Sequence, residues 1–538
     1  MGRVRAGAFA VLKGVWGFIA GSSPGLLFVL WASWENPFFL DMPWLVLGLA
    51  LAPGLLVGAL WRRPGPQAAL AVPLALWAGA VMRPEPAPVA PRLLVIGVDG
   101  ATWERIDALE LPALEALQAD GQRAILTSME PMFSPLLWTT MASGKPPNEH
   151  GIRGFRVRSD QARVPRLWDI AEAEGLSVGV WKWLVTWPPR QVDGFMVPAW
   201  LATTPETWPP ELSVVKELEL ANRQRRTTET RRSLPALALA GVQHGVRAST
   251  LVAAAGSLFA DEPRVERDLV RGRIDRDVFV WALHRHQPEL ATFTYYATDG
   301  LQHSHWGLPP ADRAYRQADL IVGELVRRVS PDTTVVVLSD HGFQSFEGPD
   351  ERLVPTTEAL KERLSQVDPE VQVHRLGIKL VVTGDVFEEL KALQDERGVP
   401  VFQVEALEPD VYGLTLTREE LSVEALEAAT AGGEPMKNYA RYRETTDRGD
   451  HHPDGIFLVR GGEGTLPSRI GLLDVAPTLY ALLGIPPAQD LPGEVVVGPT
   501  QRGPATRDGL IETLDWGDWD VDEPLVDEEA LRRLGYVE

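Results

Sequence analysis

The fold of this chain is decided by RLLVIGVDG, residues 92–100, where a short apolar run ends in an aspartate and a glycine. A run of this length bounded by turn residues is typical of a strand buried on both faces. Two later runs have the same character, and helical patterns separate them. These runs are LATFTYY (290–296) and TTVVVLS (333–339). The alternation predicts an α/β fold with a mostly parallel central sheet and helices on both faces.

Two stretches interrupt this alternation and are expected to be insertions into a main domain of residues 91–500. Residues 155–290 are long for one crossover and include the charged helical pattern VKELELANRQRRTTETRRS, and residues 345–445 also depart from the pattern. Residues 501–538 are rich in Asp and Glu. We expect this last segment to be an acidic, solvated tail.

The first 90 residues differ from the rest because they contain three long uncharged segments, 14–34, 42–61 and 64–82. The first two are long enough to cross about 30 Å of hydrocarbon as helices. The third opens with PGPQ, so its apolar part is shorter. The sequence therefore predicts a membrane anchor of two or three transmembrane helices over residues 1–90.

Basic residues give this anchor a direction. They lie before the first segment and after the second, at positions 3, 5, 13, 62 and 63. The positive-inside rule then predicts a cytoplasmic N-terminus. Three crossings would place everything after residue 90 outside the cytoplasm, in the periplasm or extracellular space, whereas two would leave it inside. A cleaved signal peptide is disfavoured, because the APVA sequence at 87–90 lies beyond the usual length of about 15–30 residues.

Composition excludes several classes of site. The chain has no cysteine, so it forms no disulfide and any metal must be held by His and carboxylate groups. Its formal net charge of -21 argues against docking of nucleic acid, whose phosphate backbone is bound by basic surfaces. A small phosphorylated substrate at a locally positive metal site remains compatible with this charge.

Each of the three predicted strands is followed by an aspartate: Asp99, Asp299 and Asp340. A single aspartate in this position is usually a helix cap or a turn former. In an open parallel sheet, however, ligand sites form beyond the carboxyl ends of the strands. We therefore expect these three carboxylates to lie along one edge of the sheet.

Histidines accompany these aspartates. His303 follows Asp299 by four residues, a spacing that puts both on one face of a helical turn. His341 follows Asp340 directly before a glycine, and GDHHPDG (449–455) adds either His451 or His452. Gathered carboxylates repel one another unless a cation lies between them. Mixed Asp and His ligands without sulfur favour zinc, with manganese as the alternative.

A serine supplies the third component. In FSPLLWTTMASGKPPNEHGI (133–152), Ser134 stands directly before a proline, eight mostly small or apolar residues follow, and Gly144 comes next. This order is typical of a short helix that is capped by the serine and ends at the glycine. Most such serines only cap a helix. Near a metal and at a helix N-terminus, however, Ser134 would become a nucleophile without a histidine base.

Taken together, these motifs resemble the alkaline phosphatase superfamily, in particular its type I phosphodiesterase/nucleotide pyrophosphatase family. The resemblance covers most of residues 92–490 and rests on an ordered set of motifs. They are RLLVIGVDG, SPLLWTTMASGKPPNEHGI, RLWDIAEAEGLSVGVWKW, TDGLQHSHW, SDHGF, GDHHPDGIFLVRG and LLDVAPTLYALLGIP. The resemblance implies an alkaline-phosphatase-like fold, with Ser134 at the position of the nucleophilic threonine or serine.

The resemblance also implies two zinc ions. One would be bound by Asp99, Ser134, Asp340 and His341, and the other by Asp299, His303 and His451. His451 is preferred to His452 because the family histidine stands second after the glycine of its motif. His150 and His305 match no ligand position and are interpreted as structural.

One position departs from the family pattern. Nucleotide pyrophosphatases carry a phosphate-binding asparagine three residues after the nucleophile, where this chain has Leu137. Lys182, in the aromatic segment WKWLVTW, could supply a positive charge, although a surface lysine is the simpler interpretation.

The main functional hypothesis is a membrane-anchored, metal-dependent hydrolase of phosphoric esters, acting on a phosphorylated small molecule or lipid. The alternative enzyme class is a transferase that passes a phospho-headgroup from Ser134 to a lipid or glycan. A sulfatase is disfavoured because Ser134 lacks the CxPxR-type sequence around it. A non-catalytic relative would keep the fold and serve only as a binding module.

Overall fold

A computed structural model describes residues 87–155, 157–223, 234–346, 351–376, 379–417, 423–444, 448–503 and 508–516. The predicted transmembrane segments within 1–86 lie outside these residues, as does most of the predicted acidic tail. In the part of the chain that is described, no helix combines the length and apolarity needed to cross a bilayer. The described residues divide into two units, of which the smaller comprises Val246–Val270 and the larger comprises the others.

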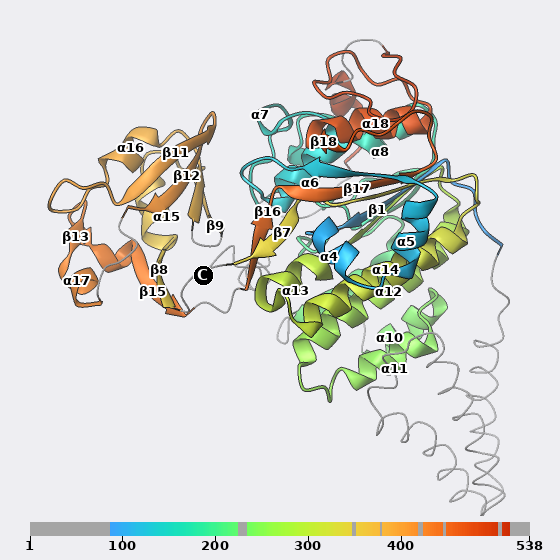
Figure 1. The fold of residues 1–538 in the computed structure, drawn as a ribbon, viewed down its shortest axis with the longest axis horizontal. Helices are drawn as coiled ribbons and strands as arrows, with labels where there is room; N and C mark the ends of the chain where they lie inside the picture. The colour runs from blue at the N-terminus through green and yellow to red at the C-terminus, as the bar shows by residue number, and fades with distance from the viewer. Residues whose placement is uncertain are drawn as a thin grey trace, which may run out of the picture. The chain divides into compact units, whose positions relative to one another are not determined.

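An eight-stranded sheet forms the centre of the larger unit, with the order β18-β2-β17-β6-β1-β5-β3-β4 (Figure 1). Only β17 runs against its neighbours β2 and β6, and the other pairs are parallel. The predicted mostly parallel sheet is therefore confirmed. The strands are β1 (Leu93–Val98), β2 (Gln122–Thr127), β3 (Val178–Trp181), β4 (Gly194–Val197), β5 (Leu290–Tyr295), β6 (Thr334–Leu338), β17 (Asp454–Arg460) and β18 (Arg469–Gly471).

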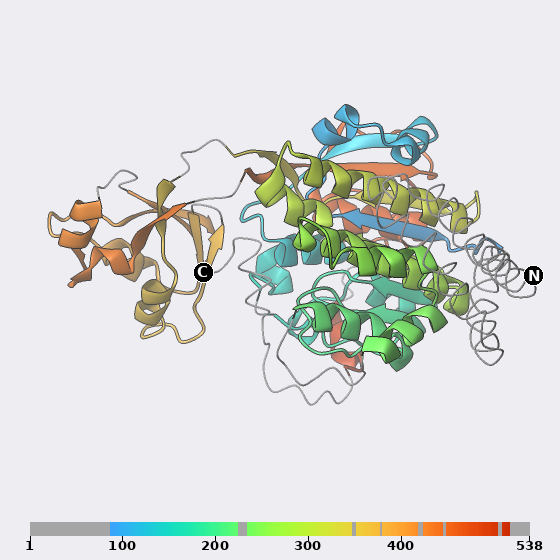
Figure 2. The same cartoon turned by 90° about the horizontal axis from the view of Figure 1, so that it is seen from below.

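Helices cover both faces of this sheet, as the alternating pattern predicts (Figures 1 and 2). One face carries α6 (Ser134–Ser143), α8 (Leu167–Ala173) and α18 (Val475–Leu483). The other face carries α5 (Pro112–Ala119) and α14 (Pro309–Arg328), with α4 (Trp103–Ala108) nearby. Every residue of β1 and β5 is buried, because a strand covered on both sides has no solvent face.

Tryptophans fill much of the core between the sheet and α6. Trp138, Trp168 and Trp183 are fully buried and belong to one hydrophobic cluster. The Trp138 ring lies against the backbone of β1 at Gly97, where an added Cβ would come within 2.4 Å of the indole. A glycine at this position of the strand therefore allows the indole to pack closely.

Residues 213–286 contain α9 (Ser213–Arg223), α10 (Leu234–Gln243), α11 (Ala248–Gly256) and α12 (Pro263–His286). The smaller unit contributes α11 and the beginning of α12 to the described residues. In the larger unit, α12 leads directly into β5 and thereby supplies the crossover from β4.

Residues 351–444 build a second sheet with its own core. Its four antiparallel strands have the order β11-β12-β10-β9, and α15 (Glu358–Leu364) and α16 (Phe387–Ala392) accompany them. Leu360, Leu390 and Leu414 are fully buried in a hydrophobic cluster separate from that of the central sheet. The strands are β9 (Gln372–Leu376), β10 (Lys379–Thr383), β11 (Phe402–Glu408) and β12 (Val411–Leu416). The antiparallel pair β8 (Glu351–Pro355) and β15 (Ala440–Glu444) brings the two ends of this part together.

Candidate metal centre

The predicted carboxylates meet beyond the carboxyl ends of neighbouring strands. Asp99 directly follows β1, Asp340 follows β6, and Asp299 lies in the first turn of α13 (Ala297–His305), which follows β5. Because β5, β1 and β6 are adjacent and parallel, their ends share one edge of the sheet. All three aspartates are buried.

The first group of potential ligands combines Asp299 with two histidines. The Asp299 Oδ1 atom lies 3.4 Å from His303 Nε2 and 3.3 Å from His451 Nε2. The two Nε2 atoms are 3.2 Å apart. The spacing of four residues between Asp299 and His303 therefore brings both side chains to the same point, as expected on a helical turn.

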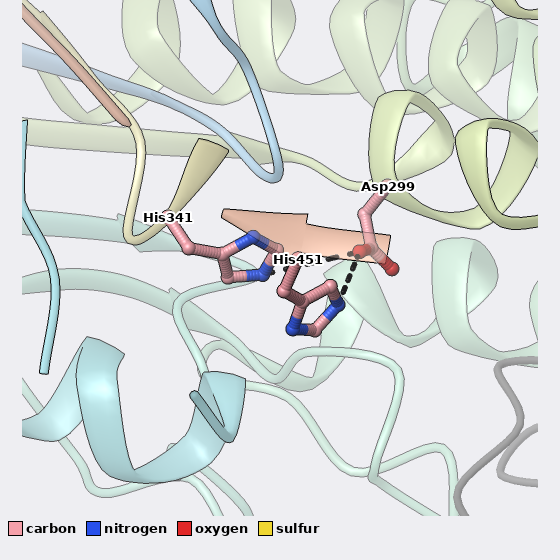
Figure 3. A group of neighbouring side chains, drawn as sticks. All are labelled: Asp299, His341 and His451. Atoms are coloured by element: carbon pink, nitrogen blue, oxygen red, sulfur yellow. Dashed lines mark ion pairs between the residues drawn. The ribbon is translucent and has the colours of Figure 1, made fainter. Parts of the chain in front are cut away.

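The second group combines Asp99, Asp340 and His341. His341 Nε2 lies 3.5 Å from Asp99 Oδ1 and 3.6 Å from Asp340 Oδ2. It also lies 3.9 Å from Asp299 Oδ1, so the two groups are contiguous. Figure 3 shows Asp299, His341 and His451 turned toward one another. The rings of His341 and His451 are stacked, with centroids 3.8 Å apart.

These separations suit bound metal. Zinc bonds of about 2.0–2.1 Å in a tetrahedral arrangement place neighbouring ligand atoms roughly 3.3–3.4 Å apart. In the first group, the two histidine Nε2 atoms lie 3.4 and 3.3 Å from Asp299 Oδ1. In the second group, the two carboxylate oxygens lie 3.5 and 3.6 Å from His341 Nε2. Several of these buried atoms have no hydrogen-bond partner among the described residues: Asp99 Oδ1, Asp299 Oδ1, both Asp340 oxygens and His341 Nε2. A cation in each group would satisfy them.

Backbone carbonyls orient two of the histidine rings. Nδ1 of His341 is 2.9 Å from the Gly342 carbonyl, and Nδ1 of His451 is 3.1 Å from the Met132 carbonyl. If each Nδ1 carries the proton and donates it, each Nε2 presents a lone pair to the cluster. Hydrogen bonds of this kind commonly fix the tautomer of metal-binding histidines.

Burial and mutual repulsion dominate the electrostatics without metal. Burial raises the pKa of Asp99 well above its ordinary value, and the charges of Asp340 and Asp299 raise it further. Burial and the charge of Asp299 likewise raise the pKa of Asp340 to about 8. Although burial opposes it, the adjacent His303 and His451 lower the pKa of Asp299. Burial lowers the pKa of His341 to about 3, so this imidazole is a neutral donor at ordinary pH.

Ser134 lies at the N-terminus of α6, beside this cluster. It is buried, and its hydroxyl group is close enough to Asp340 to lower the pKa of that carboxyl, against the larger effects of burial and Asp299. The helix begins one residue earlier than expected, because Phe133 is the N-cap and Ser134 is the first helical residue. Gly144 ends the helix in the left-handed conformation, as the sequence indicates.

Sequence reasoning missed a residue behind the cluster. Trp138 Nε1 donates a hydrogen bond to Asp99 Oδ2 at 3.2 Å, which leaves Oδ1 directed at His341. Trp138 follows Ser134 by four residues, one helical turn, so it shares a helix face with the predicted nucleophile. That spacing was the available signal. Thr298 also supports the site, donating its hydroxyl to the Asp99 carbonyl at 2.6 Å.

Lys182 does not lie at the surface, so that interpretation was wrong. Its side chain is 3% exposed and its ammonium group contacts Glu219 and Asp275 at 2.9 and 2.8 Å. The Lys182 ammonium group is therefore ion-paired with carboxylates on α9 and α12 and is not available to bind a phosphate. Leu137 is fully buried in the hydrophobic core, so its position supplies no polar group.

Two further histidines, His150 and His452, make other contacts. His150 is buried with Nε2 3.0 Å from the Thr140 hydroxyl, and its Nδ1 accepts the Ile152 amide. His452 instead accepts the Asp454 amide at its Nδ1. His451 and His452 are neighbours in β16 (Gly449–His452), so their side chains point to opposite faces of the strand.

Comparisons with known proteins identify the family. The family model described as type I phosphodiesterase / nucleotide pyrophosphatase matches residues 93–412, which is more than half of the chain. Among solved structures, the fold is similar to phosphonoacetate hydrolase from Sinorhizobium meliloti 1021 in complex with phosphonoformate. That likeness has a TM-score of 0.40 and 18% identity over 74% of this chain and 97% of the other.

None of the curated proteins compared with the chain matches it. The family match agrees with the ordered motifs and with the clustered Asp and His side chains. The chain therefore belongs to the type I phosphodiesterase/nucleotide pyrophosphatase family and is a metal-dependent phosphoric ester hydrolase of the alkaline phosphatase superfamily.

Proposed function

We propose that this protein is a membrane-anchored phosphoric ester hydrolase that uses Ser134 as its nucleophile and two divalent metal ions as cofactors. The observation that carries the proposal is the convergence of two Asp and His groups beside the N-terminus of α6. One ion would be held by Asp99, Asp340 and His341 together with the Ser134 oxygen. The other would be held by Asp299, His303 and His451.

The donor set favours zinc in both positions, with manganese as the alternative. Each group offers imidazole nitrogen and carboxylate oxygen, and the chain has no thiolate. Divalent cations bound there would lower the pKa of the Ser134 hydroxyl and offset the charge of the phosphoryl oxygens.

The chemistry of Ser134 follows in two displacements. Its Oγ atom forms a bond to phosphorus while the bond from phosphorus to the leaving oxygen breaks, and a phosphoserine results. A water molecule then attacks the phosphorus, and cleavage of the Ser134 ester bond restores the hydroxyl. In both steps the N-terminus of α6, which is the positive end of the helix dipole, would stabilise the negative charge on the phosphoryl oxygens.

The substrate is a phosphorylated small molecule or a lipid headgroup ester. The uncharged segments at 14–34, 42–61 and 64–82 support anchoring in the cell membrane, and the basic residues around them support an extracytoplasmic catalytic domain. An enzyme held there would meet phosphate esters at the outer surface of the bilayer or in the adjoining compartment.

A matched pair of serine variants tests the nucleophile. Ser134 and Ser143 are both buried and lie at opposite ends of α6, but the Ser143 hydroxyl donates to the Thr139 carbonyl at 2.8 Å, away from the cluster. We expect Ser134→Ala to abolish hydrolysis of phosphodiester and phosphomonoester substrates, and Ser143→Ala to retain it.

Metal content, measured by elemental analysis, separates a lost nucleophile from a lost cofactor. We expect about two ions per chain in the wild-type protein and in both variants. Undiminished hydrolysis by Ser134→Ala would contradict the role of Ser134. If the wild-type protein releases phosphate from a phosphomonoester without any added acceptor, it is a hydrolase and not a transferase.

A further inference from the structure

The four-stranded sheet of residues 351–444 has two buried faces with different partners. Val373 of β9 lies opposite Val382 of β10, and both belong to the sheet's own hydrophobic cluster. The next residue of β9, His374, lies opposite Val381, which belongs with Val411 to the hydrophobic cluster of the central sheet. Because successive residues of a strand point to opposite faces, His374 lies on the face that packs against the central cluster.

On that face the imidazole of His374 packs edge-on against Phe133. The two ring centroids are 5.6 Å apart at an interplanar angle of 76°. Phe155 completes the group, with its centroid 5.7 Å from that of His374 and 5.5 Å from that of Phe133. All three rings are buried, and their edge-to-face geometry is the one that aromatic rings prefer. An added Cβ at Gly154 would lie 2.6 Å from His374 Nε2, so a glycine there allows the close approach.

Phe133 stands between two residues that contribute to the candidate metal centre. The Met132 carbonyl lies 3.1 Å from Nδ1 of His451, whose Nε2 points into the cluster. Ser134 follows Phe133 directly. Phe133 is itself the N-cap of α6, and its carbonyl accepts the Leu137 amide at 3.0 Å. A shift of the Phe133 side chain would therefore move the partner of a metal-binding histidine and the nucleophile together.

We propose that His374 is a positioning residue of the active site, which acts through Phe133 on both Ser134 and His451. This inference rests on the proposed roles of Ser134 and the metal ions. The second sheet thereby contributes to catalysis although its own core is separate from that of the central sheet. The effect is expected to be large, because a misplacement of about 1 Å in a reacting group can cost about 100-fold in rate.

Four variants of the full-length chain separate positioning from stability. His374→Ala removes the ring from Phe133, whereas His374→Phe keeps an aromatic ring there. Val373→Ala is the matched control, because it creates a cavity in the same strand but on the face of the sheet's own cluster. Gly154→Ala is an independent perturbation, since its methyl group would displace the imidazole without removing it. It repeats the test if His374→Ala does not fold.

The assays are hydrolysis of bis(p-nitrophenyl) phosphate at saturating zinc and a zinc titration against a chromophoric chelator. We expect His374→Ala and Gly154→Ala to lower kcat about 10- to 100-fold with little change in KM, because the substrate still binds while the attack by Ser134 is misaligned. The same two variants should bind zinc about tenfold more weakly, through the displaced partner of His451. His374→Phe and Val373→Ala should retain both properties.

Three results would overturn the inference. One is unchanged kcat and zinc affinity in His374→Ala or, if that variant does not fold, in Gly154→Ala. Another is an equal loss of both in Val373→Ala, which would mean that the contact only stabilises the second sheet. The third is a His374→Phe variant as impaired as His374→Ala, which would assign the effect to the ring nitrogens and not to packing. Wild-type protein that hydrolyses no phosphoric ester would refute the proposed function, and the zinc titration would then decide the inference.

Discussion

Replacing Trp138 with phenylalanine tests whether the indole N–H orients the Asp99 carboxylate. Trp138 is fully buried, and its Nε1 atom is 3.2 Å from Asp99 Oδ2. The other oxygen, Oδ1, is 3.5 Å from His341 Nε2, in the group that would hold a metal ion. Phenylalanine keeps an aromatic ring at this position of the core but has no N–H to donate.

The size of the effect follows from the contact that is lost. A hydrogen bond to a charged group contributes about 1.5–3 kcal/mol. Loss of a residue that orients a metal ligand typically weakens metal binding by about 10- to 100-fold. At about 1.4 kcal/mol per factor of ten, these two figures agree. We therefore expect Trp138→Phe to bind zinc about 10- to 100-fold more weakly than the wild-type protein.

Trp168→Phe is the matched control. Trp168 is also fully buried in the same hydrophobic cluster, 5.9 Å from the Trp183 ring, but its Nε1 atom has no hydrogen-bond partner among the described residues. Both variants lose part of an indole from the core. Each should therefore lose roughly 1–3 kcal/mol of unfolding free energy in the metal-free protein.

The assay is a zinc titration against a chromophoric chelator, with chemical denaturation of the metal-free proteins in parallel. The expected result is a large loss of zinc affinity in Trp138→Phe and a small one in Trp168→Phe, at similar losses of stability. Equal zinc affinity in the two variants would refute the idea that the indole positions Asp99.

Two further predictions concern buried charge. Lys182→Met should lower the unfolding free energy by about 3–5 kcal/mol, because Asp275 would lose the cation that contacts it while buried, although Glu219 keeps Lys216 at 3.0 Å. The exposed ion pair of Arg123 with Asp107 provides the comparison, since Arg123→Met should change the unfolding free energy by less than about 1 kcal/mol. Similar losses of unfolding free energy in the two variants, measured by chemical denaturation, would contradict this reasoning. Metal binding should release protons, because Asp340 has a pKa of about 8 without metal and must ionise to act as a ligand. Zinc affinity should therefore fall about tenfold per pH unit below about pH 8 for each proton released. Calorimetry in buffers of different ionisation enthalpy should give the number of protons. Constant affinity between about pH 6 and pH 8 would contradict ionisation of Asp340 on metal binding.

Several features of the fold could be predicted because their causes are local. The apolar runs before Asp99 and Asp340 are strands, because continuous apolar residues between turn formers suit a sheet covered on both faces. The edge at which the aspartates meet follows from parallel strand direction alone. The helical spacing of Asp299 and His303 likewise follows from the period of the helix.

Other features depend on contacts that the local pattern does not contain. Lys182 follows a strand in an aromatic segment and looks like a surface residue, yet α9 and α12 bring carboxylates to its ammonium group. The antiparallel direction of β17 also has no signature in its apolar run, because the run is buried on both faces whichever way it points.

The sequence by itself determined the alternation of strands and helices, the family and the residue types of the metal centre. These depend on periodicity and on the order of short motifs along the chain. Only the tertiary structure decided which atoms meet, including the Trp138 hydrogen bond to Asp99 and the contact of His451 Nε2 with Asp299 Oδ1. The physical reason is that such contacts join residues far apart in sequence, and their geometry is set by the packing of helices on the sheet and by the strand pairing of β16.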